Sequence, residues 1–197
     1  MIVLEGGEAT GKSTQAALLA RRLGAVLTRE PGGTVFGERL RTLLLDPELP
    51  APVARAEALL MLAARAEHAA EVIAPALAAG RCVVCDRYSP STIAYQGYGR
   101  GLDPEELARL SAWAAGGVEP DRVVLLRLDR VTARSRRRAA RQPDRLEQEQ
   151  DEFYDRVDAA YAVMAAADPE HWRVIDAVGT IEEVAERVVE AIADLPT

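Results

Sequence analysis

The chain has 197 residues, of which 49% are hydrophobic, and it carries a formal net charge of −7. This length is enough for one well-buried domain and short for two, so we expect a single domain over residues 1–197. The acidic charge argues against a general nucleic-acid-binding surface, and no apolar run approaches the ~18 residues of a membrane span. Because the chain opens on a strand-like segment and not on a signal peptide, we expect a cytoplasmic protein with small-molecule partners.

Short apolar segments alternate with amphipathic segments along the chain, a pattern that predicts parallel βαβ units and an α/β fold. The expected strands span 2–4, 25–28, 81–85, 122–128 and 172–175. The expected helices span 11–23, 34–45, 53–79, 104–115, 132–141, 147–167 and 181–195. Ligands of such sheets bind beyond the carboxyl ends of the strands, so candidate functional residues should follow each strand.

The segment after the first strand has the full G-x-x-x-x-G-K-S/T pattern of a phosphate-binding P-loop. A helix N-terminus behind such a loop presents backbone N–H groups to an anion. Lys12 is the only lysine among 24 basic residues, which indicates a position that needs a compact ammonium and not a guanidinium. The residues expected to bind nucleotide phosphates are Gly6, Gly7, Glu8, Ala9, Thr10, Gly11, Lys12, Ser13 and Thr14.

Glu8 places a carboxylate inside a loop whose donors are meant for phosphate oxygens. Like-charge repulsion would weaken nucleotide binding unless this carboxylate points elsewhere. We expect a sugar hydroxyl of a second substrate or a metal-bound water as its partner. The alternative is a solvated loop residue.

Asp86 and Arg87 follow the third expected strand. Asp86 is placed like a Walker B aspartate, so it and the Ser13 hydroxyl are expected to bind Mg²⁺. At the position after this aspartate many ATPases have a glutamate that activates water, whereas this chain has Arg87, whose guanidinium can bind an acceptor phosphate through two hydrogen bonds. The alternative is that Arg87 only forms a salt bridge at the end of the strand. Cys82 and Cys85 should point to opposite faces of the strand, which favours buried thiols over a metal or redox site.

Two further groups of side chains are candidates for binding. Met61 and Arg65 share a helix face and could stack on and hydrogen-bond a planar base, although spacing alone favours a core Met61 and a surface Arg65. An arginine-rich run predicts a mobile flap that closes over a triphosphate, the alternative being a solvated helix neutralised by the acidic residues after it. Its members are Arg134, Arg136, Arg137, Arg138, Arg141 and Arg145.

Over nearly its whole length the chain resembles thymidylate kinases of the bacterial type. The segments that carry this resemblance are TREPGGT at 28–34, DRYS at 86–89, AYQG at 94–97 with GRG at 99–101, and DRLE at 144–147. The resemblance implies a three-layer P-loop nucleoside-monophosphate-kinase-like fold with a five-stranded parallel sheet flanked by helices. It also implies a homodimer and one kinase domain with a basic flap at about 134–147. The implied reaction is magnesium-dependent transfer of the γ-phosphoryl group of ATP to dTMP, giving dTDP and ADP.

The resemblance also implies roles for individual residues. Glu8 would take the 3′-hydroxyl of the acceptor sugar, Arg87 its phosphate, and Arg65 an exocyclic oxygen of the base, with Tyr95 crowding the ribose 2′ position. The catalytic arginine would come from residues 136–141. The implied catalytic residues are Lys12, Arg87, Arg137 and Arg141, and the implied dTMP-binding residues are Glu8, Arg29, Arg41, Met61, Arg65, Arg87, Thr92, Tyr95 and Gln96.

The chain departs from the family pattern at Met61, which stands where the family usually has an aromatic ring over the thymine. Another nucleoside monophosphate kinase is therefore an alternative. A non-catalytic P-loop module is a second one. A GTPase switch is disfavoured because its Asn-Lys-x-Asp sequence needs an asparagine and a second lysine, and the chain has neither.

Overall fold

The computed structural model describes residues 1–129, 132–133, 135–136 and 144–195. Its strands form one parallel sheet in the order β2-β3-β1-β4-β5. The strands are β1 Ile2–Glu5, β2 Val26–Arg29, β3 Val83–Asp86, β4 Arg122–Arg127 and β5 Trp172–Asp176. The five predicted strands are confirmed, and they differ from the prediction only at their ends.

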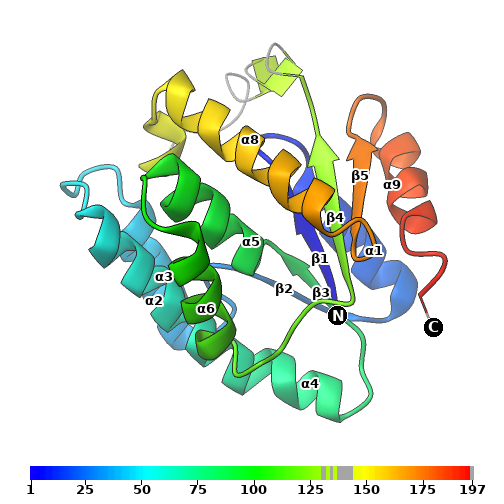
Figure 1. Ribbon diagram of the computed structural model, residues 1–197. Helices are drawn as coiled ribbons and strands as arrows, with labels where there is room; N and C mark the ends of the chain where they lie inside the picture. Colours follow the sequence, from blue (N-terminus) through cyan, green and yellow to red (C-terminus); the bar gives the residue numbers. More distant parts are fainter. Residues whose placement is uncertain (130–131, 134, 137–143, 196–197) are drawn as a thin grey trace.

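Helices cover both faces of this sheet, so the three-layer α/β prediction is also confirmed (Figure 1). The longer helices are α1 Lys12–Leu23, α2 Val35–Leu45, α3 Ala54–His68, α6 Pro104–Ala114, α8 Asp151–Ala167 and α9 Ile181–Glu190. The shorter ones are η1 Ala69–Ile73, α4 Ala74–Ala78, α5 Ser89–Thr92, η2 Ile93–Gly99 and η3 Leu146–Gln148. No helix in the described ranges is long and apolar enough to cross a membrane.

The structure differs from the predicted helices in two places. The helix expected over 53–79 is divided by the π-helical η1. A helical segment that was not predicted, α5 with the π-helical η2, follows β3. Pro90 is tolerated because it occupies the first turn of α5. At the end of η2 a glycine is needed, because a Cβ at Gly99 would lie 2.6 Å from the Phe153 ring of α8. Most of the helix expected over 132–141 lies outside the described residues.

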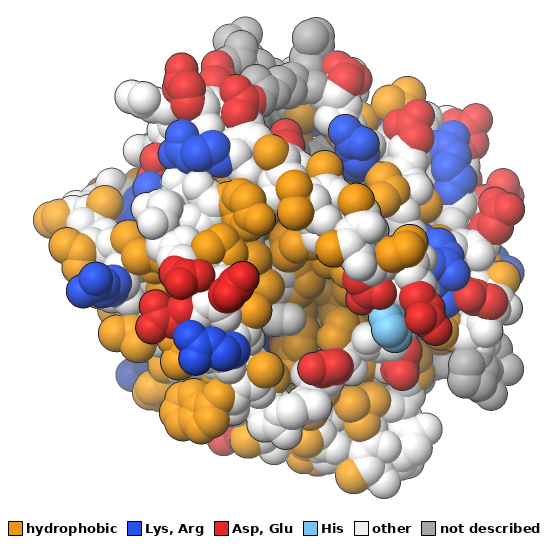
Figure 2. Space-filling model, viewed as in Figure 1, with side chains coloured by type: hydrophobic (Ala, Val, Ile, Leu, Met, Phe, Trp, Pro, Cys, Tyr) orange, Lys and Arg blue, Asp and Glu red, His pale blue; other side chains and the backbone are white. Residues whose placement is uncertain are grey.

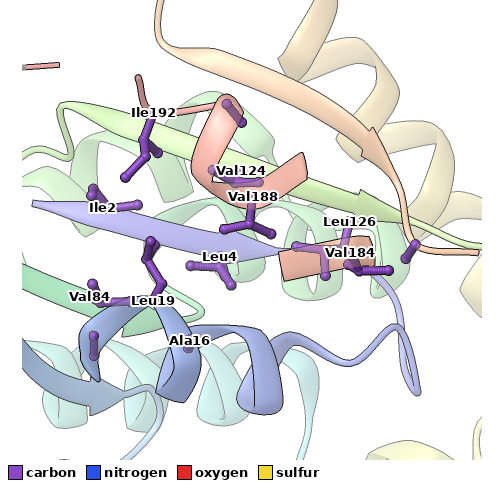
Figure 3. Close-up of a cluster of buried hydrophobic side chains, with 13 residues drawn as sticks. Ile2, Leu4, Ala16, Leu19, Val84, Val124, Leu126, Val184, Val188 and Ile192 are labelled. Carbon is purple, nitrogen blue, oxygen red and sulfur yellow. The ribbon is translucent and has the colours of Figure 1, made fainter. Parts of the chain in front are cut away.

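The core is built from side chains that alternate between the two faces of the sheet. Ile2 and Leu4 of β1 pack with α1 and α9 in one buried cluster, which Figure 3 shows in close-up. Val3 faces the other side and packs with η1 and β3. Cys82 packs against the first cluster, whereas Cys85 belongs to the opposite one, and both are free thiols as predicted. A strand held from both faces gives the loop that follows it a fixed starting point.

The register of the sheet brings the ends of β1 and β3 together. Leu4 pairs with Asp86, so the P-loop and the residues after β3 leave the same edge side by side. Gly6 begins the loop with φ 139°, and a Cβ there would lie 2.3 Å from the Leu126 carbonyl oxygen. The glycine is therefore required for the loop to turn across β4.

Candidate active site

A cavity of about 690 Å³ opens at the carboxyl edge of the sheet. This volume lies in the range of small-molecule sites. The predicted site residues that line it are Glu8, Ala9, Gly11, Lys12, Ser13, Thr14, Arg29, Arg41, Met61, Arg65, Asp86, Arg87, Thr92, Tyr95 and Gln96. Gly6, Gly7 and Thr10 do not line it, although Gly7 and Thr10 border a smaller cavity of about 90 Å³.

Lys12 begins α1 and folds back over the P-loop. Its Nζ donates to the Gly7 carbonyl oxygen at 2.6 Å and to Thr10 Oγ1 at 3.4 Å. The side chain is buried, and burial lowers the pKa of Lys12, as does the charge of nearby Arg87. A desolvated ammonium whose hydrogen-bond partners are uncharged oxygens interacts strongly with an incoming phosphate.

Ser13 and Asp86, the two residues predicted to bind Mg²⁺, contact each other directly. Ser13 Oγ donates to Asp86 Oδ2 at 2.5 Å, and Asp86 Oδ1 is buried with no hydrogen-bond partner in the described part of the chain. A hydroxyl and a carboxylate oxygen are ligands that Mg²⁺ prefers. The described residues contain no cluster of three His, Cys, Asp or Glu side chains, so phosphate oxygens and water would complete such a site.

The carboxylate of Glu8 has its partners inside the protein. Arg87 Nη2 donates to Glu8 Oε1 at 2.5 Å, and the Tyr95 hydroxyl donates to the same oxygen at 2.9 Å. Arg87 also lies over the Tyr95 ring, 5.0 Å from its centroid. Glu8 is therefore hydrogen-bonded within the protein before any ligand binds, and its expected contact with a ligand stays a prediction. Glu8, Arg87 and Tyr95 line the cavity, so a ligand bound there would meet both signs of charge.

Arg87 itself is held in an unusual backbone conformation, with φ 70°. A non-glycine residue in this left-handed region costs about 1–2 kcal/mol, and such residues concentrate at functional sites. On its other side, Arg87 Nη1 donates to the Gly6 carbonyl oxygen, Ser91 Oγ and the Tyr161 hydroxyl at 3.1, 3.1 and 3.3 Å. Sequence reasoning missed Ser91 and Tyr161, because no local pattern links them to Arg87.

Arg65 of α3 is buried, so the interpretation that spacing alone favoured, a surface arginine, is wrong. Its Nε donates to Glu30 Oε2 at 2.8 Å, and its Nη2 lies 2.7 Å from the same oxygen. Nη1 donates to Ser111 Oγ at 3.1 Å and Nη2 to Thr92 Oγ1 at 3.0 Å. Met61 is half-buried and lines the cavity, so the core assignment is also wrong. Glu30, just after β2, supplies the charge that makes burial of the guanidinium possible.

Arg29, the last residue of β2, and Arg41 of α2 line the cavity. Arg29 Nη2 donates to Glu38 Oε2 at 2.8 Å, and Arg41 Nη1 donates to the Pro31 carbonyl oxygen at 3.0 Å. Burial lowers the pKa of Arg41, and the charge of Arg29 lowers it further. Two neighbouring guanidinium groups that repel each other favour an anion between them.

Only part of the predicted flap can be placed. Arg134, Arg137, Arg138 and Arg141 lie outside the described residues, and Arg136 Nη2 donates to the Ala177 carbonyl oxygen at 3.4 Å. Arg145 is buried and not solvated: its Nε donates to the Leu44 carbonyl oxygen and its Nη2 to Glu57 Oε2, both at 2.8 Å. It therefore anchors the end of the arginine-rich run to the body of the protein.

Glu57 of α3 is a second buried carboxylate that sequence reasoning missed. It is fully buried and accepts hydrogen bonds from Gln96 Nε2 at 2.9 Å and from Arg100 at 3.1 and 3.2 Å, besides that from Arg145. These hydrogen bonds outweigh its desolvation and hold the pKa of Glu57 below its ordinary value. Gln96 is thus fixed beside the cavity by a carboxylate from another helix.

Comparisons with known proteins all point to one family. The thymidylate kinase family model matches residues 4–188. The thymidylate kinase of Halorhodospira halophila is 49% identical over 201 residues, which cover 98% of this chain and 94% of that protein. The enzyme of Pelotomaculum thermopropionicum is 50% identical over 182 residues, with 89% and 84% covered. A crystal structure of thymidylate kinase from Ehrlichia chaffeensis superposes with a TM-score of 0.81 at 32% identity, covering 98% of this chain and 97% of that one.

Proposed function

This chain belongs to the thymidylate kinase family, and from that premise we propose that it transfers the γ-phosphoryl group of ATP to the 5′-phosphate of dTMP. One observation supports the proposal most directly. A single cavity holds a P-loop lysine and a Ser13–Asp86 pair beside an arginine, Arg87, that stands where a hydrolytic enzyme would place its water-activating acid. The site is equipped to bind a second phosphate and not to activate water.

The donor half of the site consists of the P-loop from Gly6 to Thr14. Lys12 and the loop N–H groups hold the ATP phosphates, and Ser13 and Asp86 hold Mg²⁺, which fits the partnerless Asp86 Oδ1. Bound Mg²⁺ neutralises charge on the phosphates. An oxygen of the dTMP phosphate forms a bond to the γ-phosphorus while the bond from that phosphorus to the ADP oxygen breaks. The protein contributes position and charge to this step.

The acceptor half of the site consists of Glu8, Arg87 and Tyr95. Arg87 holds the dTMP phosphate, with Arg29 and Arg41 as cationic neighbours, and Glu8 accepts the 3′-hydroxyl. The Tyr95 ring packs edge-on against Phe153 with centroids 5.9 Å apart, so it cannot swing away easily. A fixed ring supports the proposed exclusion of a ribose 2′-hydroxyl.

The part of the acceptor site that binds the base is formed by Met61, Arg65, Thr92 and Gln96. Arg65 makes three hydrogen bonds within the described residues, one each from Nε, Nη1 and Nη2, so the second N–H of Nη1 is left to donate to an exocyclic oxygen of thymine. The flexible Met61 side chain takes the place of an aromatic ring against the base. Selectivity for thymine would then depend more on hydrogen bonding than on stacking.

The catalytic charge is proposed to come from Arg137 and Arg141 in a flap at about residues 134–147, within one kinase domain spanning 1–197. Arginines brought to a transferring phosphoryl group accelerate analogous reactions by about 10³–10⁵. Arg145 supports this arrangement, because its buried hydrogen bonds to Leu44 and Glu57 hold the C-terminal end of the proposed flap against the rest of the protein.

The protein is further proposed to be a homodimer that works in the cytoplasm, where its substrate ATP is available. Exposed apolar side chains gather on α2, α3 and α6, which pack side by side (Figure 1). They include Leu43 on α2, Leu59 on α3 and Trp113 on α6, which are 48%, 63% and 78% exposed. Figure 2 shows hydrophobic side chains interspersed with charged ones on the face that carries α6 and α8. Trp113→Arg should raise the fraction of monomer in light scattering.

The proposed reaction is tested by incubating the protein with ATP, Mg²⁺ and each nucleoside monophosphate in turn. We expect conversion of dTMP to dTDP with a kcat/KM well above that of any other acceptor. Efficient use of a different monophosphate with no use of dTMP would assign the chain to another acceptor class. ATP binding with no phosphoryl transfer to any acceptor would indicate a non-catalytic P-loop module.

A further inference from the structure

Glu5 ends β1 and is fully buried, yet it has no part in the chemistry described above. Its Oε1 accepts from the backbone N–H groups of Tyr88 and Ser91 at 2.9 and 3.2 Å. Its Oε2 accepts from Ser91 Oγ at 2.7 Å and from the Tyr161 hydroxyl at 2.9 Å. Burial raises the pKa of Glu5, while the nearby Arg87 charge and the hydrogen bonds from Ser91, Tyr88 and Tyr161 act in the opposite direction and favour the carboxylate.

Both hydroxyls that contact Glu5 also accept from Arg87 Nη1. Ser91 Oγ and the Tyr161 hydroxyl lie 3.1 and 3.3 Å from Arg87 Nη1, and 3.0 Å from each other. A hydroxyl has one proton to donate, and a guanidinium can only donate. Because an ionised carboxylate can only accept, both hydroxyl protons point to Glu5 and both sets of lone pairs are left for Arg87. The carboxylate thus sets the direction of the whole relay.

Arg87 is therefore gripped from two sides. Glu8 and Tyr95 hold Nη2 from the cavity, where a bound acceptor would compete for their hydrogen bonds. Ser91 and Tyr161 hold Nη1 from the side of Glu5, which does not line the cavity. Ser91 lines the cavity but Glu5 and Tyr161 do not, so the hydrogen bonds that Tyr161 makes with Arg87 and Glu5 lie away from an entering substrate.

We propose that Glu5 is a positioning residue for the acceptor, which fixes the guanidinium of Arg87 through Ser91 and Tyr161. This rests on the proposed role of Arg87 in holding the dTMP phosphate. A glutamine at position 5 cannot replace the carboxylate in either orientation. Its NH₂ group would face two backbone N–H donors in one orientation. In the other it would turn the hydroxyl protons toward Arg87.

The test compares Glu5→Gln and Tyr161→Phe with a matched control on the same helix. Tyr154→Phe also removes a hydroxyl hydrogen bond from α8, that to the Leu146 carbonyl oxygen at 2.7 Å, but not one to Arg87. For each variant, steady-state kinetics give the KM for dTMP, the KM for ATP and kcat, calorimetry gives the Kd of dTMP alone, and thermal melting reports folding. Glu5→Gln and Tyr161→Phe should each raise the KM and Kd of dTMP by about tenfold, the scale of one hydrogen bond to a charged group. The KM for ATP should change less than about twofold.

The double variant separates positioning from a general loss of stability. Because both residues act through one relay, Glu5→Gln combined with Tyr161→Phe should weaken dTMP binding no more than Glu5→Gln alone. Wild-type affinity for dTMP in a folded Tyr161→Phe protein would overturn the inference, and this variant carries the test if Glu5→Gln does not fold. Arg87→Ala separates the proposed role of Arg87 from that of Glu5. If Arg87→Ala leaves the affinity for dTMP unchanged, both roles are wrong. If Arg87→Ala weakens dTMP binding and Tyr161→Phe does not, only the role of Glu5 is wrong.

Discussion

Replacing Arg65 with methionine tests whether the buried ion pair with Glu30 stabilises the fold. The two side chains are only 3% and 4% exposed. Methionine is close in length and is a good helix former, so the change removes the charge while keeping the apolar stem and the helix. It leaves the Glu30 carboxylate buried beside His68 Nδ1 at 3.0 Å.

The expected cost follows from burial. Removing one partner of a buried ion pair costs about 3–5 kcal/mol, because the other charge stays desolvated. The pair Arg29–Glu38 has almost the same separation, 2.8 Å, but its side chains are 51% and 43% exposed. Arg29→Met should therefore cost only about 0.2–1 kcal/mol. In a chain of this size these losses of unfolding free energy correspond to a fall in Tm of about 6–20 °C for Arg65→Met and of at most about 4 °C for Arg29→Met.

Urea unfolding of both variants, followed by circular dichroism without nucleotides, gives the two free energies of unfolding directly. Nucleotides are left out because a ligand that binds only the folded protein would add its own stabilisation. Similar losses in the two variants, or a loss below about 1 kcal/mol in Arg65→Met, would refute the argument that burial makes this pair essential.

Three further predictions concern the loop, the turn after β2 and the metal. Lys12→Arg should lower kcat by about 10²–10³ while the melting temperature stays near wild type, because a guanidinium does not fit where the ammonium contacts the loop. Gly33→Ala should cost about 2–5 kcal/mol of unfolding free energy, since φ is +82° and a Cβ would lie 2.5 Å from His68 Cδ2. Gly101→Ala, with φ +76° and open space around the Cβ, is its control at about 1–2 kcal/mol. Asp86→Asn should raise the Mg²⁺ concentration for half-maximal activity by about tenfold or more, and chelation should abolish wild-type activity; an unchanged Mg²⁺ titration would place the metal elsewhere.

Sequence reasoning succeeded where a feature depends on its neighbours in the chain. The P-loop is a contiguous pattern between a strand and a helix, and Asp86 is the last residue of an otherwise apolar strand. Parallel pairing then places the ends of these strands at one edge, with Leu4 opposite Asp86. The hydrogen bond between Ser13 and Asp86, which are 73 residues apart, follows from this pairing.

Sequence reasoning failed where a side chain depends on a partner far along the chain. Arg65 looks like a surface residue on its helix, because Glu30 lies 35 residues earlier and joins it only through the fold. Glu5 has partners 86 and 156 residues away, so a charged residue at a strand end carried no visible signal. The π-helical geometry of η2, which presents Tyr95, has no local signature either.

The arrangement of charge explains how an acidic protein with a net charge of −7 can build a cationic site. Buried carboxylates contact the arginines of the proposed acceptor site: Glu30 pairs with Arg65, and Glu5 is linked to Arg87 through two hydroxyls. Lys12 differs, because its hydrogen bonds go to uncharged oxygens of its own loop. The arginines are thus positioned before substrate arrives, which lowers the reorganisation needed during phosphoryl transfer. Changing the carboxylates should therefore alter acceptor recognition while phosphate binding at Lys12 persists.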